Sequence, residues 1–190
     1  MKVAFILYDQ VTLLDFAGLY DPITRLNTMG FCPDLEYVVS SHTDQVRSSE
    51  GLLLIPDEIC TDLKSFDYVL IPGGDGVKEL MKSPEYLGWI SSAGPDTTIA
   101  AVCGGVLLLG AAGLLRDRKA TTHPVMQEVL KHFAREVLMD RIVHDGRVIT
   151  AGGVTAAIDL GLYITELIAG CDARMSIQKQ MDYPYYQGMR

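Results

Sequence analysis

A short stretch in the middle of the chain places the strongest constraint on how it can fold. Residues 97–102 form an apolar run that begins with β-branched residues and ends abruptly at Cys103. Gly104 and Gly105 follow at once, and a second apolar run leads to Gly113. The first run is typical of a strand buried on both faces, and the second favours a helix packed against it. Because no linker separates them, the chain must turn sharply at Cys103.

A sharp turn from a strand into a helix holds one side chain at the carboxyl edge of a sheet, and glycines after it avoid Cβ clashes. Near the first turn of a helix, free N–H groups and the helix dipole favour a cysteine thiolate. The spacing around Cys103 therefore predicts a nucleophile elbow that carries a reactive thiol of lowered pKa. The alternative is a buried structural cysteine, because most unpaired cysteines are inert small hydrophobes.

The composition indicates a globular protein with one domain over residues 1–190, since 48% of the residues are hydrophobic and 21% are charged. A net charge of −8 without a Lys/Arg cluster argues against nucleic-acid binding. The four cysteines are scattered and have no metal-ligand spacing to the four histidines, so we expect neither a metal site nor a disulfide framework. Without a signal-peptide pattern or an apolar run of about eighteen residues, a cytoplasmic protein that does not enter the membrane is expected.

Strand and helix patterns alternate along the chain. Strands are expected at residues 3–8, 35–40, 67–71 and 97–102, with hairpins at 46–55 and around Asp145-Gly146. Helices are expected at residues 14–29, 77–81, 85–92, 124–133, 155–169 and 172–180, followed by a tyrosine-rich tail that packs on a surface or on a partner chain. This alternation predicts an α/β fold with a mostly parallel sheet covered on both faces.

Candidate site residues follow the predicted strands, at the sheet edge where α/β folds bind ligands. Gly73 and Gly74 present backbone N–H groups without side chains, which suits an oxyanion cradle, although such a loop can simply be a turn. Asp15 lies near the start of the first predicted helix, where its ordinary role is that of an N-cap. Together with Cys103, these residues are expected to converge.

Several motifs, in the same order along the chain, resemble the DJ-1/PfpI superfamily. They lie at residues 70–74 (Leu-Ile-Pro-Gly-Gly), 101–105 (Ala-Val-Cys-Gly-Gly) and 110–115 (Gly-Ala-Ala-Gly-Leu-Leu). This resemblance implies a flavodoxin-like three-layer sandwich of the glutamine amidotransferase type and a homodimer. Further stretches resemble the branch that holds isonitrile hydratases and the ligand domains of AraC-type regulators; they are residues 11–18, 120–123, 145–153 and 156–162.

The resemblance also implies roles for individual residues. In the hydratases the elbow cysteine attacks the isonitrile carbon, an acidic residue manages its proton, and water completes an N-substituted formamide without a cofactor. Carried over by position, Cys103 is the nucleophile and Asp15 the acid/base, with a pKa raised by a neighbouring thiolate. Contacts to the small-molecule substrate or to an oxyanion are expected from Gly73, Gly74, Gly104, Gly18 and His123.

The chain departs from the hydratases directly after the cysteine, where they have Thr and this chain has Gly104. His123 equally suits a helix-capping role, because Pro124 follows it. A non-catalytic ligand-sensing domain is an alternative function, although the chain ends at Arg190 without the helix-turn-helix units of AraC-type regulators. Glyoxalase or deglycase chemistry on reactive carbonyls, or oxidation sensing by Cys103, is a further alternative.

Overall fold

A single sheet runs through the middle of the molecule. The computed structural model describes residues 1–189, and in that part the strand order of the sheet is β10 (Ile142–Asp145), β11 (Val148–Ala151), β7 (Thr98–Val102), β6 (Tyr68–Ile71), β1 (Lys2–Leu7), β2 (Glu36–Ser41), β5 (Glu58–Ile59). All neighbouring strands pair in parallel except β10 and β11, which form a hairpin. Two short pairs lie outside this sheet: β3 (Val46–Arg47) with β4 (Leu53–Leu54), and β8 (Lys119–Ala120) with β9 (Glu136–Val137).

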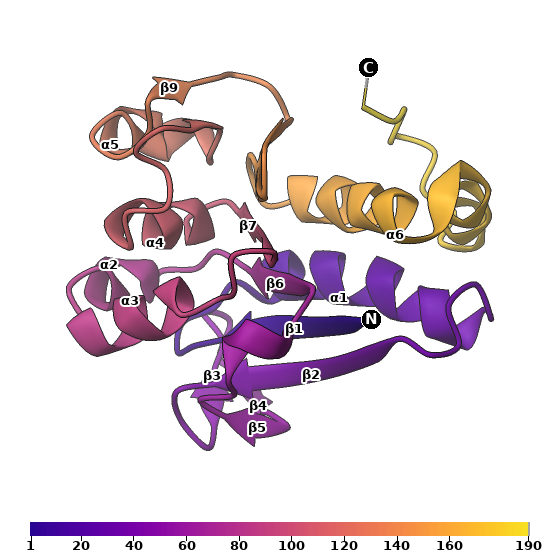
Figure 1. Cartoon of the computed structure of the whole chain (residues 1–190), viewed down its shortest axis with the longest axis horizontal. Coiled ribbons are helices and arrows are strands. Elements are labelled where there is room, and N and C mark those ends of the chain that lie inside the picture. Colours follow the sequence, from indigo (N-terminus) through magenta and orange to yellow (C-terminus); the bar gives the residue numbers. More distant parts are fainter. Residues whose placement is uncertain (190) are drawn as a thin grey trace.

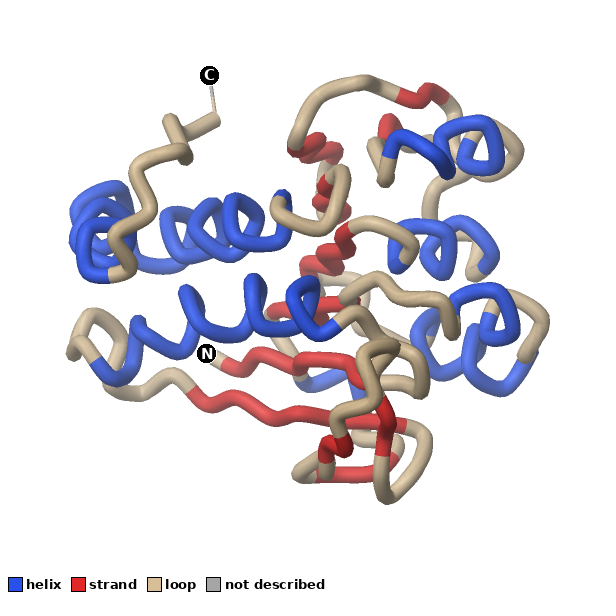
Figure 2. Tube along the Cα trace, turned by 180° about the vertical axis from the view of Figure 1, so that it is seen from behind, coloured by secondary structure: helices blue, strands red, loops and turns tan. Residues whose placement is uncertain are grey.

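Helices cover both faces of the sheet and make three layers (Figures 1 and 2). One face carries α1 (Leu13–Thr28) and α6 (Ala156–Gln180). The other carries α2 (Val77–Leu80), α3 (Pro84–Ser91), α4 (Gly105–Ala111) and α5 (Gln127–Leu130), with the 3₁₀ turns η1 (Leu63–Ser65) and η2 (Pro124–Met126). Residues of β1 alternate between the two cores: Val3 and Phe5 pack on the α1–α6 side, whereas Ala4 and Ile6 pack on the other.

The predicted α/β fold with a mostly parallel sheet is confirmed, and most element boundaries lie within two residues of those expected. The two predicted helices 155–169 and 172–180 meet at Gly170, whose φ of 83° lies outside the helical region. The predicted helix start at Pro124 is confirmed, but the segment begins as the 3₁₀ turn η2, continues into α5 and ends at Leu130 rather than at about Phe133. Phe133 packs against Gly110 of α4, so tertiary contact overrides the local helical preference.

The contact between α1 and α6 depends on small residues. A Cβ on Gly18 would lie 2.7 Å from the Ala157 Cβ, and a Cβ on Gly161 would lie 2.5 Å from the Gly18 carbonyl oxygen. Pro22, one turn after Gly18, has no N–H with which to bind that oxygen within the helix. The two helices therefore approach closely along this glycine pair.

No helix within residues 1–189 is both long enough and apolar enough to cross a membrane.

Candidate active site

Cys103 occupies the turn between β7 and α4. Its φ is 55°, a left-handed conformation that few non-glycine residues adopt. Its N–H donates to the carbonyl oxygens of Ala151 and Gly152, at 3.1 and 2.9 Å. Its own carbonyl accepts a 2.7 Å hydrogen bond from the Thr122 hydroxyl. These contacts from two neighbouring segments hold the strained turn, so the sharp strand-to-helix turn predicted at Cys103 is present in the fold.

Asp15 reaches the same edge of the sheet from the third residue of α1. Its side chain is fully buried, and Oδ2 accepts a 3.0 Å hydrogen bond from the Gly73 N–H. The N-cap position of α1 belongs to Thr12, so the N-cap interpretation of Asp15 was wrong. Its second oxygen, Oδ1, has no hydrogen-bond partner among residues 1–189. A buried carboxylate therefore has one oxygen fixed and the other free for chemistry.

Gly73 marks the point where the acid and the thiol meet. A Cβ placed on Gly73 would lie 2.5 Å from Asp15 Oδ2, 2.8 Å from Cys103 Cβ and 2.8 Å from the Gly104 nitrogen. Only hydrogen fits there, because the Asp15 side chain from α1 and two atoms of the Cys103–Gly104 turn surround the same point. The structure thus brings Asp15, Cys103, Gly73 and Gly104 together.

The pKa values of Asp15 and Cys103 correct the expectation that the Cys103 thiol has a lowered pKa. Burial raises the pKa of Asp15 from 3.8 to about 6, opposed by the Gly73 hydrogen bond. Burial, and then the charge of Asp15, raise the pKa of the Cys103 thiol to about 12. The predicted lowering of the cysteine pKa was wrong, because burial and a neighbouring carboxylate outweigh the start of a helix. At neutral pH the pair therefore holds one proton, mainly on sulfur.

The loop after β6 is tied to the start of α1. Val11 and Gly74 form an antiparallel bridge, and the Thr12 N–H donates to the Gly73 carbonyl at 2.9 Å. A Cβ on Gly74 would lie 2.2 Å from the Gln10 carbonyl oxygen, so glycine is needed for this close approach. The Gly73 N–H is occupied by Asp15, which corrects its predicted use as an oxyanion donor. Its role is to fix the acid.

The space beside Gly104 is apolar. A Cβ there would lie 3.4 Å from Met126 Sδ and Cε and 3.4 Å from Val77 Cγ2. The Gly104 N–H acts to lower the pKa of the Cys103 thiol, against the larger effects of burial and Asp15. The hydratase pattern has a Thr hydroxyl at this position, whereas Gly104 has no side chain and its backbone lies beside Met126 and Val77.

Two other predicted residues have structural roles. The His123 ring nitrogen Nδ1 accepts a 3.3 Å hydrogen bond from the Val125 N–H, which caps η2 as the capping alternative expected. Gly18 lies in the contact between α1 and α6, against Ala157 and Ile158, so its prediction as a substrate contact is corrected to helix packing.

Two residues that were not predicted as site residues also support the site. Both carboxylate oxygens of Glu50 lie 3.3 Å from the Leu13 nitrogen, at the start of the helix that carries Asp15. Thr122 holds the carbonyl of the elbow. Thr122 lies inside the family motif at residues 120–123, but Glu50 carries no local signal because 37 residues separate it from Leu13. Within residues 1–189, no group of three or more His, Cys, Asp or Glu side chains could hold a metal ion.

Comparison with known proteins identifies the family of the chain. The DJ-1/PfpI family matches residues 1–167. An isonitrile hydratase of Pseudomonas putida is 36% identical over 185 residues, which cover 96% of this chain and 78% of that protein. The glutathione-independent glyoxalase DJR-1.2 of Caenorhabditis elegans is 31% identical over 146 residues, covering 74% of this chain and 77% of that protein.

A solved structure shows the same architecture. The crystal structure of a ThiJ/PfpI family protein from Pseudomonas syringae superimposes with a TM-score of 0.86 and 29% identity, covering 96% of this chain and 75% of that one. With the elbow, its glycine loop and the order of the strands all in place, the chain belongs to the DJ-1/PfpI family.

Proposed function

We infer that the protein adds water to the carbon of an isonitrile and releases an N-substituted formamide. One observation carries the proposal: Asp15 Oδ2 and Cys103 Cβ both lie within 3 Å of a single point above Gly73. A nucleophile and a proton carrier at one site are what addition to an electrophilic carbon needs. The similarity to an isonitrile hydratase over 96% of the chain supports the choice of electrophile.

The first step forms a bond between Cys103 sulfur and the terminal isonitrile carbon. As this bond forms, the thiol proton moves to Asp15, which is mainly ionised above its pKa of about 6. One carbon–nitrogen π pair moves to the nitrogen as sulfur attacks, and the carbon keeps its own lone pair. Asp15 then delivers the same proton to that lone pair. The product is a thioimidate, with carbon bonded to sulfur, hydrogen and the substituted nitrogen. Because one proton is taken and given back, no outside acid is consumed.

Water completes the second step. Its oxygen bonds to the thioimidate carbon, and one of its protons goes to the substrate nitrogen. The carbon–sulfur bond then breaks with its electron pair on sulfur, and the second water proton returns to sulfur through Asp15. The formamide leaves, and Cys103 and Asp15 regain their starting forms. The net change is the addition of one water molecule to the isonitrile.

The side chains around Gly104 favour some isonitrile substituents over others. Met126 and Val77 would each lie 3.4 Å from a Cβ at Gly104, so the substituent meets a flexible thioether and an aliphatic side chain. Cys103 itself is only 6% exposed. We expect isonitriles with compact apolar substituents to react faster than those with charged ones, because a charge beside these groups would lose hydration without a partner.

The proposal is tested with benzyl isonitrile in water labelled with oxygen-18. N-Benzylformamide carrying one labelled oxygen should form with the wild type. Turnover should fall at least about a thousandfold in Cys103→Ala and in Asp15→Asn, whereas Cys171→Ala, at an exposed free thiol, should retain it. Absence of formamide from the wild type, or equal turnover by Cys103→Ala, would refute the proposal.

Glyoxalase chemistry is the second candidate. The 31% identity to the glyoxalase DJR-1.2 favours it, because a thiol beside a carboxylate could also form a thiohemiacetal with a 2-oxoaldehyde and move its proton. Methylglyoxal consumption, followed with the same variants, separates the two candidates. If methylglyoxal is converted and benzyl isonitrile is not, the glyoxalase assignment replaces the hydratase one.

A further inference from the structure

A cleft of about 1120 Å³ lies on the outer side of β10, away from the Cys103 thiol. Three parts of the chain form its walls: strand β10 with the residues before it, the first turns of α6, and the tail residues 183–189. We refer to this space as the edge cleft. Small-molecule sites are concave and combine apolar walls with a few converging polar groups.

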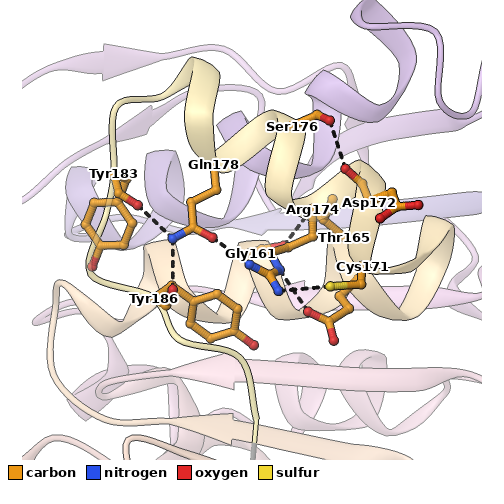
Figure 3. Close-up of polar contacts among 10 residues, drawn as sticks. Gly161, Thr165, Cys171, Asp172, Arg174, Ser176, Gln178, Tyr183 and Tyr186 are labelled. Atoms are coloured by element: carbon orange, nitrogen blue, oxygen red, sulfur yellow. Dashed lines mark hydrogen bonds and ion pairs between the residues drawn. The ribbon is translucent and has the colours of Figure 1, made fainter.

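The tail is fixed as a wall of the edge cleft. The Gln178 side-chain amide donates to the carbonyl oxygens of Tyr183 and Tyr186, each at 2.8 Å (Figure 3). The Arg174 guanidinium lies 5.5 Å from the centre of the Tyr186 ring and pairs with Glu166 at 2.9 Å. Tyr186 is therefore 7% exposed although it lies only four residues from the end of the chain.

Two residues that line the edge cleft each carry a buried polar atom without a hydrogen-bond partner among residues 1–189. Asp159 is 4% exposed; its Oδ2 pairs with Arg141, but its Oδ1 has no hydrogen-bond partner among residues 1–189. The Tyr186 hydroxyl is likewise without a partner in this part of the chain. A buried polar atom left unbonded costs roughly 1–3 kcal/mol, so a pair of them around one cleft indicates groups that bind something else.

The surroundings define the chemistry of that ligand. The Arg141 guanidinium already neutralises Asp159, so the ligand needs no net charge. Tyr183, Tyr185 and Ile158 provide apolar surface for an aromatic or alkyl body. Asp159 Oδ1 can only accept a hydrogen bond, whereas the Tyr186 hydroxyl can donate one. A secondary amide offers the complementary N–H and carbonyl in one group.

We propose that the edge cleft binds a small neutral secondary amide with an aromatic or alkyl substituent. Its N–H bonds Asp159 Oδ1, its carbonyl accepts from the Tyr186 hydroxyl, and its substituent lies against Tyr183 and Tyr185. The N-substituted formamides of the proposed reaction fall within this class, but the chemistry of the cleft stands without that reaction.

The test uses N-benzylformamide and its N-methyl derivative, which lacks the N–H. Both are titrated into the wild type and into Cys103→Ala, and binding is followed by calorimetry and by chemical shifts of the tail tyrosines. N-Benzylformamide should bind saturably to both proteins, and the N-methyl derivative at least about fivefold more weakly, as expected for one lost hydrogen bond. Equal binding of the two amides, or no saturable binding, would overturn the proposal. Binding to Cys103→Ala is independent of turnover, so failure of the proposed reaction is distinguished from failure of this inference.

Tyr186→Phe removes only the hydroxyl. It should weaken N-benzylformamide about fivefold and leave the thermal midpoint of the free protein unchanged or higher, because an unbonded buried hydroxyl is removed. Tyr37→Phe, at a residue of β2 remote from the cleft in the sheet order, is the matched control and should bind as the wild type does. Unchanged binding in Tyr186→Phe would show that the hydroxyl does not contact the amide.

Discussion

Asp15 and Cys103 titrate together, because the two buried side chains meet beside Gly73 and the charge of the carboxylate raises the pKa of the thiol. Burial makes both charged forms costly, so the resting pair keeps its proton on sulfur at neutral pH. The thiolate is then available only when Asp15 accepts that proton. This arrangement protects the thiol at rest and makes the acid indispensable for attack.

Gly73→Ala tests whether the close approach of Asp15 and Cys103 requires a residue without a side chain at position 73. The added Cβ would fall within 2.8 Å of Asp15 Oδ2 and Cys103 Cβ, so one of them must shift. We expect turnover to fall at least about a hundredfold, as for other misplacements of about 1 Å in active sites. Gly88→Ala, where a Cβ meets nothing within 4 Å, should keep full activity. Normal turnover by Gly73→Ala would contradict the assigned geometry.

At single residues, the sequence allowed Cys103 and Asp15 to be predicted, because a turn signal and a family motif mark them. It did not reveal that the Gly73 N–H binds Asp15, since the direction of an N–H depends on backbone angles. The direction of the Cys103 pKa was predicted wrongly for a related reason. Desolvation depends on residues from the whole fold, whereas the start of a helix can be recognised locally.

Among the elements, α1 and α6 matter most for the site, because α1 carries Asp15 and its position depends on the Gly18–Gly161 contact. Gly18→Ala should reduce the free energy of unfolding by about 1–3 kcal/mol, because the new Cβ would lie 2.7 Å from Ala157 Cβ. Gly88→Ala is the matched control in a helix, and should gain up to about 1 kcal/mol from helix propensity. Urea unfolding measures both; a stabilised Gly18→Ala would contradict the close approach.

Element boundaries could be predicted wherever periodicity and glycine signals were strong, as in α1 and at Gly170. The two-residue strands β5 and β9 were not predicted, because two residues carry no periodicity. The error over residues 124–133 has another origin. The packing of Phe133 on Gly110 is a contact between distant segments, which local pattern cannot show.

At the scale of the whole molecule, Asp15 links the candidate site to stability. Its pKa is raised from 3.8 to about 6 on folding, so the folded state binds its proton more tightly. The protonated carboxyl therefore gives its full contribution to the free energy of unfolding below pH 3.8, and this contribution is lost as the pH rises through about 6. Above that pH the buried carboxylate is ionised, which costs on the order of 3 kcal/mol.

Asp15→Asn should therefore unfold at a higher urea concentration than the wild type at pH 8, and the difference should disappear by about pH 4. The amide oxygen of Asn can still accept from the Gly73 N–H, so the fold keeps that bond. Asp34→Asn, at an exposed loop position, is the control and should show little difference at either pH. A wild type that is more stable than Asp15→Asn at pH 8 would contradict the stated cost of the carboxylate.

The parallel sheet also explains why the site could be located before its geometry was known. Strands β1, β6 and β7 run parallel side by side, so their carboxyl ends lie at one edge. Residues separated by almost ninety positions, such as Asp15 and Cys103, meet there. The alternation of strands and helices predicts this edge, whereas the strand order and the edge cleft depend on long-range packing.

The most direct test of the shared proton is the rate at which iodoacetamide alkylates Cys103, measured from pH 5 to 10 by mass spectrometry. In the wild type the rate should rise to about pH 6 and then level off through the neutral range, because the pair there holds one proton at every pH. In Asp15→Asn the rate should climb about tenfold for each pH unit without levelling, as for a lone buried thiol. If the wild type climbs in the same way as Asp15→Asn, the two residues do not share a proton and the proposed mechanism is wrong.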